Sequence, residues 1–278
     1  MPSAYWYYGL ILISVILTGI SLYYKKCWRL LVLHIIISGI IHPVELIILL
    51  TGGYYYLPGI LHDPQIDSGL GAYVSDFFIV PASAVAINAF SLSWHSTLGI
   101  AIVFTVIDWL FAKIGIYVHF WWKSIYTGIG LIILYSISKW FWRSFQEKQP
   151  SLIFRLLVIY LTYAPIHSII NFVVARLLHA FTFEVTFFTA PERNFPVFNN
   201  LHLLLTTIVV TLCIGLRVLF RYRIIGIILL GAVNWALGYF HIFESALLSS
   251  QYLTLIPIIG ILFIMTMYRI AKLNYLFP

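Results

Sequence analysis

Long apolar runs follow one another along almost the whole chain, and each has about the ~20 residues that a helix needs to cross a bilayer. Helices are expected because hydrocarbon offers no partner to an unpaired backbone amide, and the runs lack the period-2 alternation of barrel strands. The sequence therefore predicts an all-α fold, a polytopic transmembrane helix bundle that forms one domain over residues 1–278. The nine predicted spans are residues 4–24, 28–51, 71–90, 97–116, 124–143, 152–174, 200–218, 224–243 and 252–270.

The composition excludes a separate soluble domain. The chain is 62% hydrophobic and 9% charged, whereas about a quarter of the residues of a soluble domain are charged. The connection at 91–96 carries no Lys, Arg, Asp or Glu. A re-entrant turn at this point is therefore an alternative, and the bundle would then have eight helices.

The positions of Lys and Arg predict the orientation, because these residues resist translocation across a membrane. With the N-terminus outside, 12 of the 16 Lys and Arg residues fall on the inner side, beginning with Lys25, Lys26 and Arg29. We expect a multi-pass protein of the cell membrane with its C-terminus in the cytoplasm. The net charge of +7 then faces anionic headgroups. Membrane lipid is the expected partner, no nucleic acid is required, and no oligomeric state is indicated.

Acidic residues inside the predicted helices are the strongest indication of a function. Glu45, Asp76 and Asp108 fall in the outer halves of the second, third and fourth spans. An ionisable side chain within a bilayer costs at least ~2.5 kcal/mol, so these acids should face the bundle and find partners. The sequence predicts a polar cavity open to the outside, with these acids and His42 as candidate catalytic residues. The alternative is that the acids only pair with His or Lys to join helices.

A His-x-x-Glu pattern occurs twice, at His42 and Glu45 and again at His241 and Glu244. Residues three apart share a face of a helix, so each pair would present an imidazole and a carboxylate to one neighbour. If the two helices meet, the four side chains could bind a divalent metal, the one cofactor that the sequence indicates. The pattern is short and common by chance, so a plain hydrogen-bonded pair is the alternative.

Polar side chains on other spans also indicate an inward face. His167 and Asn171 share a face of the sixth span, His202 lies in the seventh and Asn234 in the eighth, and His119 follows the fourth. We expect them to line the same cavity. Interhelical hydrogen bonds alone would also explain such polar positions.

Motifs of familiar enzymes are missing from the sequence. It contains no Walker-type phosphate loop, no dinucleotide fingerprint, no HExxH zinc motif and no Gly-x-Ser-x-Gly elbow. We also expect no internal repeat between the two halves, which argues against an inverted-repeat transporter.

Residues 40–146 carry a family resemblance. It depends on Glu45, the SDFFIVP stretch that contains Asp76, Asp108 with Trp109, His119 with Trp121, and the aromatic and basic end KWFWRSF. This stretch resembles a small, uncharacterised polytopic membrane-protein family common in spore-forming Firmicutes. The acids at Asp76 and Asp108 are more often Glu in that family, and its chains stop near position 146. The resemblance implies that Glu45, Asp76, Asp108 and His119 form a polar set, and it implies no activity.

The one-sided distribution of these residues favours a site that binds or acts on an outer-leaflet lipid, an isoprenoid or an extracytoplasmic small molecule. In an enzyme, Glu45 or Asp76 would be the general acid, and His42 and His241 would relay protons or bind metal. Whether the protein is an enzyme stays open.

Two other functions are compatible with the sequence. A proton- or cation-coupled transporter would use the same acids, and it requires a second polar vestibule near His34 and His95 on the inner side. An accessory or sensory subunit would instead bind a partner through its outer loops.

Overall fold

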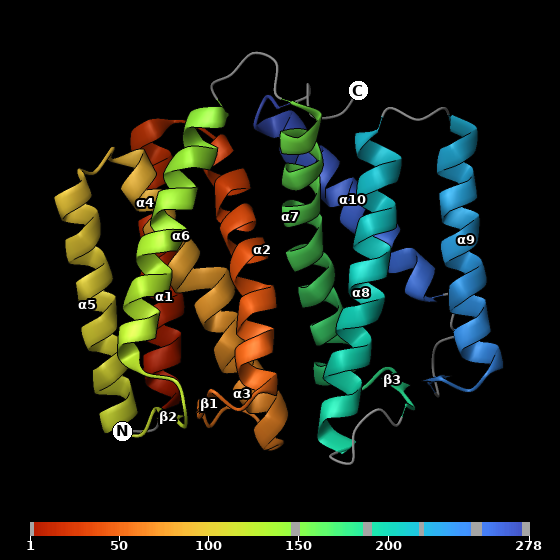
Figure 1. The fold of residues 1–278 in the computed structure, drawn as a ribbon, viewed down its shortest axis with the longest axis horizontal. Coiled ribbons are helices and arrows are strands. Elements are labelled where there is room, and N and C mark those ends of the chain that lie inside the picture. The colour runs from red at the N-terminus through yellow and green to blue at the C-terminus, as the bar shows by residue number, and fades with distance from the viewer. Residues whose placement is uncertain (1–2, 146–150, 186–190, 217–219, 246–251, 274–278) are drawn as a thin grey trace. The chain divides into compact units, whose positions relative to one another are not determined.

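The computed structural model describes residues 3–145, 151–185, 191–216, 220–245 and 252–273. The chain forms two compact units, unit 1 (Met1–Lys148) and unit 2 (Gln149–Pro278). The described residues form nine helices, of which seven are long and apolar enough to cross a membrane (Figure 1). The predicted all-α bundle is confirmed, and the apolar helices support a location in a membrane. The joining of both units into one domain stays a prediction.

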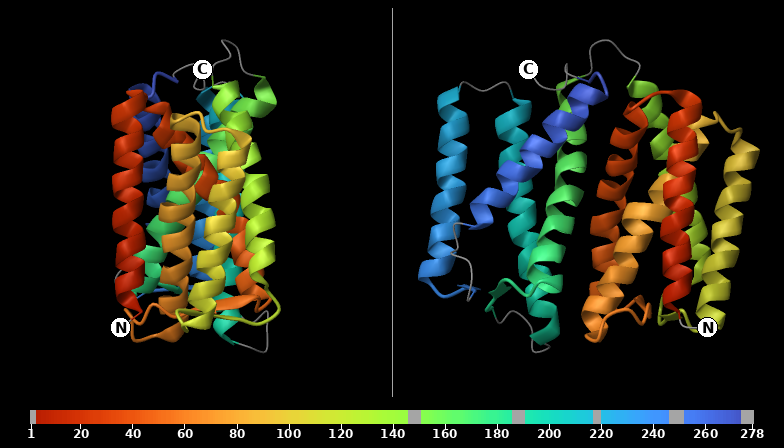
Figure 2. Two further views of the ribbon diagram at one scale, coloured as in Figure 1. Left: turned by 90° about the vertical axis from the view of Figure 1, so that its left-hand side faces the viewer. Right: turned by 180° about the vertical axis from the view of Figure 1, so that it is seen from behind.

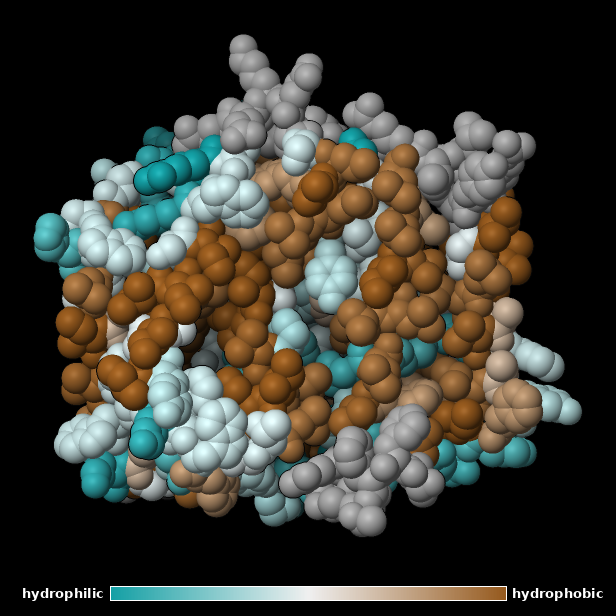
Figure 3. Space-filling model, viewed as in Figure 1, coloured by the Kyte–Doolittle hydropathy of each residue, from teal (hydrophilic) through white to brown (hydrophobic). Residues whose placement is uncertain are grey.

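Unit 1 consists of helices and one two-stranded ribbon. Its elements are α1 (Ala4–Lys25), α2 (Arg29–Leu50), β1 (Tyr54–Tyr56), α3 (Pro64–Val74), α4 (Val80–Ala89), α5 (Trp94–Lys113), β2 (Tyr117–His119) and α6 (Ser124–Ser144). α3 and α4 are two halves of one helix, Pro64–Ala89. Apolar side chains cover the middle of these helices on the face at the left of Figure 3, and polar residues gather toward their ends. A bilayer requires this distribution.

A π-helical turn at Ser75–Ile79 joins α3 to α4 and contains Asp76. Pro81 has no N–H, so the carbonyl of Phe77, four residues earlier, lacks its α-helical donor. His34 of α2 supplies a donor, because its Nε2 lies 2.8 Å from that carbonyl oxygen. Single π-helical turns often occur at functional sites. The contact between His34 and Phe77 connects α2 to the π-helical turn that contains Asp76.

α2 and α5 end in the same way. Gly52 and Gly115 follow them with left-handed backbone conformations, at φ angles of 68° and 75°. Glycine adopts this conformation without the steric cost of a side chain. Each glycine leads into a strand, and β1 pairs antiparallel with β2 with Tyr55 opposite Val118. The ribbon closes the end of unit 1 at which α1 begins (Figure 1).

The connection between α4 and α5 is a tight turn. Ser91 has a φ angle of 51°, and the Ser93 hydroxyl accepts from the backbone N–H of Ser96 at 3.2 Å, which caps α5. Lys139 of α6 donates to the carbonyl of Leu92 at 3.0 Å. The described residues therefore agree with nine helices and not with eight.

Unit 2 contains a second ribbon. Its elements are α7 (Leu152–Asn171), β3 (Thr182–Phe183), α8 (Pro191–Gly215), α9 (Phe220–Tyr239), β4 (Phe243–Glu244) and α10 (Tyr252–Ile270). A π-helical segment, Phe172–Leu177, extends α7. β3 and β4 pair antiparallel with Phe183 opposite Phe243, and both rings are buried in an apolar cluster.

Two helices begin earlier than predicted. The sequence predicts the third span from residue 71, but α3 begins at Pro64. The Asp63 carboxylate caps it by accepting from the N–H groups of Gln65 and Ile66 at 2.8 and 3.0 Å. Asp before Pro is a strong helix start, and here it outweighs the polar composition of the first turns. α8 likewise begins at Pro191 and not at residue 200.

The two units repeat one order of elements. Apart from α1, each has helix, strand, helix, helix, strand and helix in its described residues. α5 and α9 have 20 residues each and begin 126 positions apart. The sequence Arg-Leu-Leu-Val begins at Arg29 and, with the same spacing, at Arg155. The prediction of no internal repeat is therefore wrong. Each described copy has four helices when α3 and α4 are counted as one.

Candidate functional site

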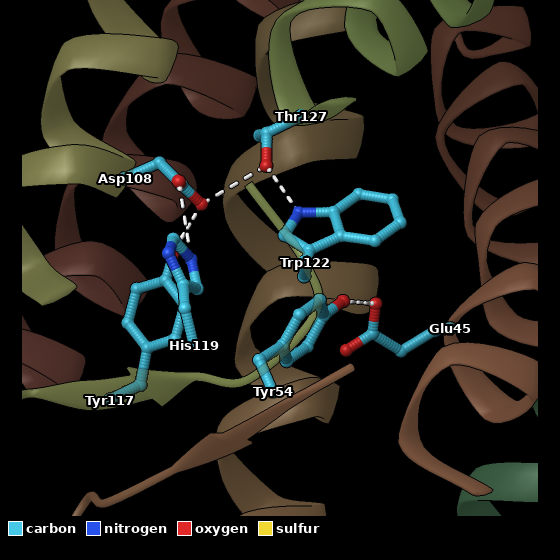
Figure 4. A network of polar contacts seen from close by, with 7 residues as sticks. All are labelled: Glu45, Tyr54, Asp108, Tyr117, His119, Trp122 and Thr127. Carbon is cyan, nitrogen blue, oxygen red and sulfur yellow. Dashed lines mark hydrogen bonds and ion pairs between the residues drawn. The ribbon is translucent and has the colours of Figure 1, made fainter. Parts of the chain in front are cut away.

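Asp108, near the end of α5, is the centre of a polar network in unit 1 (Figure 4). Its Oδ1 accepts hydrogen bonds from the Tyr117 hydroxyl and, at 3.1 Å, from Thr127 Oγ1. Trp122 Nε1 donates to Thr127 Oγ1 at 2.9 Å. His119 Nε2 lies 3.4 Å from Asp108 Oδ2. β2 and α6 therefore hold this carboxylate from two sides, and 12% of its side chain stays exposed.

Glu45 of α2 has a similar partner on the other strand. The Tyr54 hydroxyl of β1 donates to Glu45 Oε2 (Figure 4). Glu45 is buried, and His42 lies one turn earlier on the same helix. The two strands of the ribbon thus each supply one phenol to one carboxylate.

Asp76 is the most deeply buried of the three acids, at 1% exposure. Its Oδ2 lies 3.8 Å from Nδ1 of His42, so the two form an ion pair when the imidazole is protonated. The His42 ring packs beside the rings of Tyr73 and Phe77, with centroids 5.7 and 6.3 Å apart. His42 of α2 therefore lies close both to Asp76 and to two aromatic side chains of the helix that carries Asp76.

The alternation of side chains along the ribbon determines which residues face the acids. Successive residues of a strand point to opposite faces, so Tyr54 and Tyr56 share a face with Tyr117 and His119. The Tyr117 ring lies 5.4 Å from Tyr56, 5.9 Å from Tyr54 and 4.8 Å from His119. Aromatic packing therefore fixes the direction in which the hydroxyl groups point.

Burial raises the pKa of Tyr54, Tyr56 and Tyr117 well above the ordinary value of a phenol. The negative charges of Glu45 and Asp108 raise these pKa values further. The phenols therefore stay protonated and donate, while the carboxylates accept. Such an arrangement stabilises charge inside a helix bundle without a metal or a Lys.

The structure brings the predicted residues of unit 1 together. Glu45, Asp76, Asp108, His42 and His119 come from three helices and one strand and gather at the end closed by the ribbon. The Tyr54 and Tyr117 rings pack with their centroids 5.9 Å apart, which connects the two phenol–carboxylate pairs. Their catalytic roles stay predictions.

Sequence reasoning missed Tyr54 and Tyr117, the partners of the acids. Each tyrosine follows its carboxylate by nine residues, with the left-handed glycine between them, as Glu45–Gly52–Tyr54 and Asp108–Gly115–Tyr117. The shared pattern, acid-x6-Gly-x-Tyr, is visible in the sequence. It is hard to recognise because aromatic runs such as those around both tyrosines are also typical of the membrane interface.

Unit 2 has its own buried polar cluster. His202 Nε2 donates to Asn234 Oδ1 at 2.9 Å, and Asn171 Nδ2 donates to Asn199 Oδ1 at 3.2 Å. The His167 ring lies 6.4 Å from the His202 ring. Neither ring nitrogen of His167 has a hydrogen-bond partner among the described residues. The four predicted lining residues of unit 2 thus gather within that unit. A cavity shared with unit 1 stays a prediction.

The polar residues of the two units occupy equivalent positions of the repeat. The three pairs, each 126 residues apart, are Glu45 with Asn171, Asp76 with His202, and Asp108 with Asn234. The ribbons match as well, because Tyr56 lies opposite Tyr117 in unit 1 and Phe183 lies opposite Phe243 in unit 2. Unit 2 therefore has amides and an imidazole where unit 1 has carboxylates.

The second His-x-x-Glu pair does not have the predicted geometry. α9 ends at Tyr239, and His241 adopts a left-handed conformation with a φ angle of 56°. Glu244 lies in β4, so the two residues do not share a helix face and that prediction is wrong. His42 and Glu45 do lie on one helix, α2. Among the described residues, no group of three or more His, Cys, Asp or Glu side chains could hold a metal ion.

No protein-family model, no curated protein and no solved structure matches this chain. The resemblance of residues 40–146 to a family of spore-forming Firmicutes stays a prediction, although unit 1 ends close to the same position, at Lys148. The candidate site is therefore defined by the geometry of this chain alone.

Proposed function

We propose that unit 1 binds, or acts on, an outer-leaflet lipid, an isoprenoid or an extracytoplasmic small molecule at the carboxylates Glu45, Asp76 and Asp108. The observation that carries the proposal is that one ribbon binds Glu45 and Asp108 through Tyr54 and Tyr117, while Asp76 pairs with His42 on the helix that carries Glu45. Ionisable groups inside membrane helices are costly, so they are functional candidates by default.

The contacts support distinct roles for the side chains. Asp108 and His119 form a carboxylate–imidazole pair, and their side chains are 12% and 17% exposed. The two facing atoms, Oδ2 and Nε2, are buried and have no hydrogen-bond partner among the described residues, so they are available to a proton donor or acceptor of a ligand. Asp76 and His42 form a second such pair at greater depth. Tyr54 and Tyr117 hold their carboxylates in place as hydrogen-bond donors.

The location of the ribbon supports a site on one side of the membrane. β1 and β2 lie at the end of unit 1 where α1 begins, and the distribution of Lys and Arg supports an orientation with this end outside the cell membrane. The C-terminus would then lie in the cytoplasm.

Transport is the weaker proposal because of His34. A coupled transporter would use this residue in a second vestibule on the inner side. Its Nε2 instead donates to the Phe77 carbonyl, where it compensates for the missing N–H of Pro81. A helix-joining role therefore accounts for His34.

The amide variants Glu45→Gln, Asp76→Asn and Asp108→Asn test the proposal. Each replaces the ionisable carboxyl group with an amide and nearly keeps the volume of the side chain. Protein is purified from its native membrane, washed by detergent exchange, and extracted for mass spectrometry of bound lipids, isoprenoids and small molecules. We expect at least a tenfold loss of one co-purifying species in these variants.

Asp63→Asn is the matched control. Asp63 caps α3 in the same unit but is outside the network, and Asn caps a helix equally well. Thermal unfolding in detergent shows whether each variant is folded. If all three folded amide variants retain the same species in wild-type amounts, the carboxylates do not form the binding site.

A further inference from the structure

An apolar groove runs along unit 1 beside the carboxylate site. It has a volume of about 710 Å³ and lies between α1 and α5. α1 packs against α4, and α5 packs against α6. Figure 2 (left) shows α4 between α1 and α5, and Val80, Ser83 and Ala86 of α4 also line the groove. Side chains such as Leu17, Val103 and Phe104 line it.

The groove is at least as long as the hydrocarbon layer of one leaflet is thick. On α5 its lining extends from Ser96 to Phe111, which is ~22 Å at 1.5 Å per residue. Half of the hydrocarbon thickness is ~15 Å. On α1 the lining runs from Tyr7 to Leu17, which is ~15 Å. An extended acyl chain of a membrane lipid covers this distance, because the leaflet is built from such chains.

The groove ends at the polar network. Asp108, Tyr117 and Thr127 line it at the ribbon end, and they are the residues that share hydrogen bonds around the Asp108 carboxylate. A molecule in the groove would therefore present a polar end to Asp108 and an apolar end to α1, α4 and α5. A water-soluble small molecule would leave most of the apolar wall without a partner.

We propose that this groove holds one acyl chain of an outer-leaflet lipid, with the headgroup of that lipid at Asp108, Tyr117 and Thr127. The inference rests on the proposed function and names its substrate class. The Asp108 carboxylate accepts a hydrogen bond from a hydroxyl or ammonium of the headgroup, and His119 lies beside it as an acid or base.

Gly99 allows a direct test because it lines the groove and has open space around it. A Cβ atom at this position would meet nothing within 4 Å. Gly99→Leu therefore places an apolar side chain in the groove, and its Cβ atom meets no neighbour. The protein is reconstituted in vesicles of phosphatidylethanolamine and phosphatidylglycerol with a phosphatidylglycerol probe that carries a photoactivatable acyl chain. We expect wild-type labelling on α1 and α5, and at least fivefold less on Gly99→Leu.

Gly130→Leu is the matched control. Gly130 is exposed on α6, and a Cβ atom added there would also meet nothing within 4 Å, but this residue does not line the groove. Its labelling should equal that of the wild type. Equal labelling of Gly99→Leu and wild type would overturn the groove assignment. Labelling by a photoactivatable isoprenyl alcohol in place of the acyl probe would overturn the choice of an acyl chain.

The two proposals fail in different ways. If Asp108→Asn loses its bound species while Gly99→Leu is labelled like the wild type, the carboxylate site stands and the acyl groove does not. If Gly99→Leu loses its labelling while all three amide variants keep their bound species, the groove holds a lipid that the carboxylates do not recognise, and the proposed function fails.

Discussion

Units 1 and 2 share one order of helices and strands, but their equivalent positions differ in chemistry. Unit 1 has Glu45, Asp76 and Asp108 where unit 2 has Asn171, His202 and Asn234. Asn cannot ionise, so two of the three proton-exchanging groups of unit 1 are replaced by fixed hydrogen-bonding groups. The comparison indicates that the scaffold does not require the carboxylates and that unit 1 retains them for another reason.

The ribbons change together with the acids. In unit 1, Tyr54 donates to Glu45 and Tyr117 donates to Asp108. At the equivalent places of unit 2, the Phe181 and Phe243 rings pack 5.2 Å apart in an apolar cluster. A buried hydroxyl without a partner is destabilising. Phenol and carboxylate are therefore present together or absent together, which indicates that the tyrosines serve the acids and not the ribbon.

The largest effect is expected when a carboxylate is placed in unit 2. In Asn171→Asp, the new carboxylate replaces an amide that donates to Asn199 Oδ1. The ribbon of unit 2 has no phenol that could donate to this carboxylate. A buried charge without a donor should lower the free energy of unfolding by about 3 kcal/mol, measured by thermal or denaturant unfolding in detergent. Adding Phe181→Tyr should recover part of this loss. Full stability of Asn171→Asp alone would break the link between acid and phenol.

The converse change in unit 1 should have a somewhat smaller effect. Tyr117→Phe removes the phenol that donates to Asp108, and a hydrogen bond to a charged group contributes about 1.5–3 kcal/mol. Unfolding in detergent should show a loss in this range. Tyr55→Phe is the control, because Tyr55 lies on the opposite face of β1 and should change stability by less than about 0.5 kcal/mol.

The tyrosine ribbon should also respond to alkaline pH. Burial raises the pKa of Tyr54, Tyr56 and Tyr117 in the folded state. Between about pH 10 and these raised values, the unfolded chain releases protons that the folded chain retains, so stability falls as pH rises. The slope is about 1.4 kcal/mol per pH unit for each tyrosine.

Hydrogen exchange of the two ribbons measures this difference. Opening of β1 and β2 should become easier above about pH 10, while β3 and β4 carry Phe183 and Phe243 and lack these phenols. Tyr117→Phe should make the slope in unit 1 shallower. Identical slopes in both ribbons would show that the phenols do not titrate with ribbon opening.

The smallest effect is expected at the turns. Gly115 and His241 are equivalent left-handed residues after α5 and α9. A residue with a Cβ costs about 1 kcal/mol in this conformation, so His241→Gly should stabilise unit 2 and Gly115→Ala should destabilise unit 1 by about that amount. Thermal unfolding of both variants measures the difference. A loss of stability in His241→Gly would mean that the imidazole makes a contact that outweighs the strain.

The helices were predictable from hydropathy because a bilayer accepts few alternatives to apolar helices. The ribbons were not, since strands as short as Thr182–Phe183 leave no readable alternation. The end of α9 was also missed, because His241 occupies a position where glycine is the usual signal.

The repeat was hidden by two single-residue shifts. The spacing between equivalent residues is 126 up to Asn171, becomes 127 from His179 to Asn194, and returns to 126 at His202. The shifts fall at the π-helical segments Phe172–Leu177 and Ser75–Ile79, each of which holds one residue more than an α-helical turn. Few identical residues remain to show the match.

The acids of the site were predictable from the free-energy cost of placing an ionisable side chain in a bilayer, because residues that carry this cost are usually functional. Their mutual distances were not, since these depend on the angle at which α2, α3 and α5 meet. The sequence also could not reveal that Asp76 approaches His42, because the π-helical turn changes the direction of the side chains that follow α3.

The number of residues in the π-helical turn is therefore as important for the position of Asp76 as the type of residue at that position. Deleting one residue between Ser75 and Ile79 would restore α-helical geometry, and it would rotate everything before that point by about 100° relative to α4. Asp76 would then turn away from α2 although every side chain of the site was still encoded. Evolution can switch such a site on or off by a single codon insertion, without replacing any of its acids.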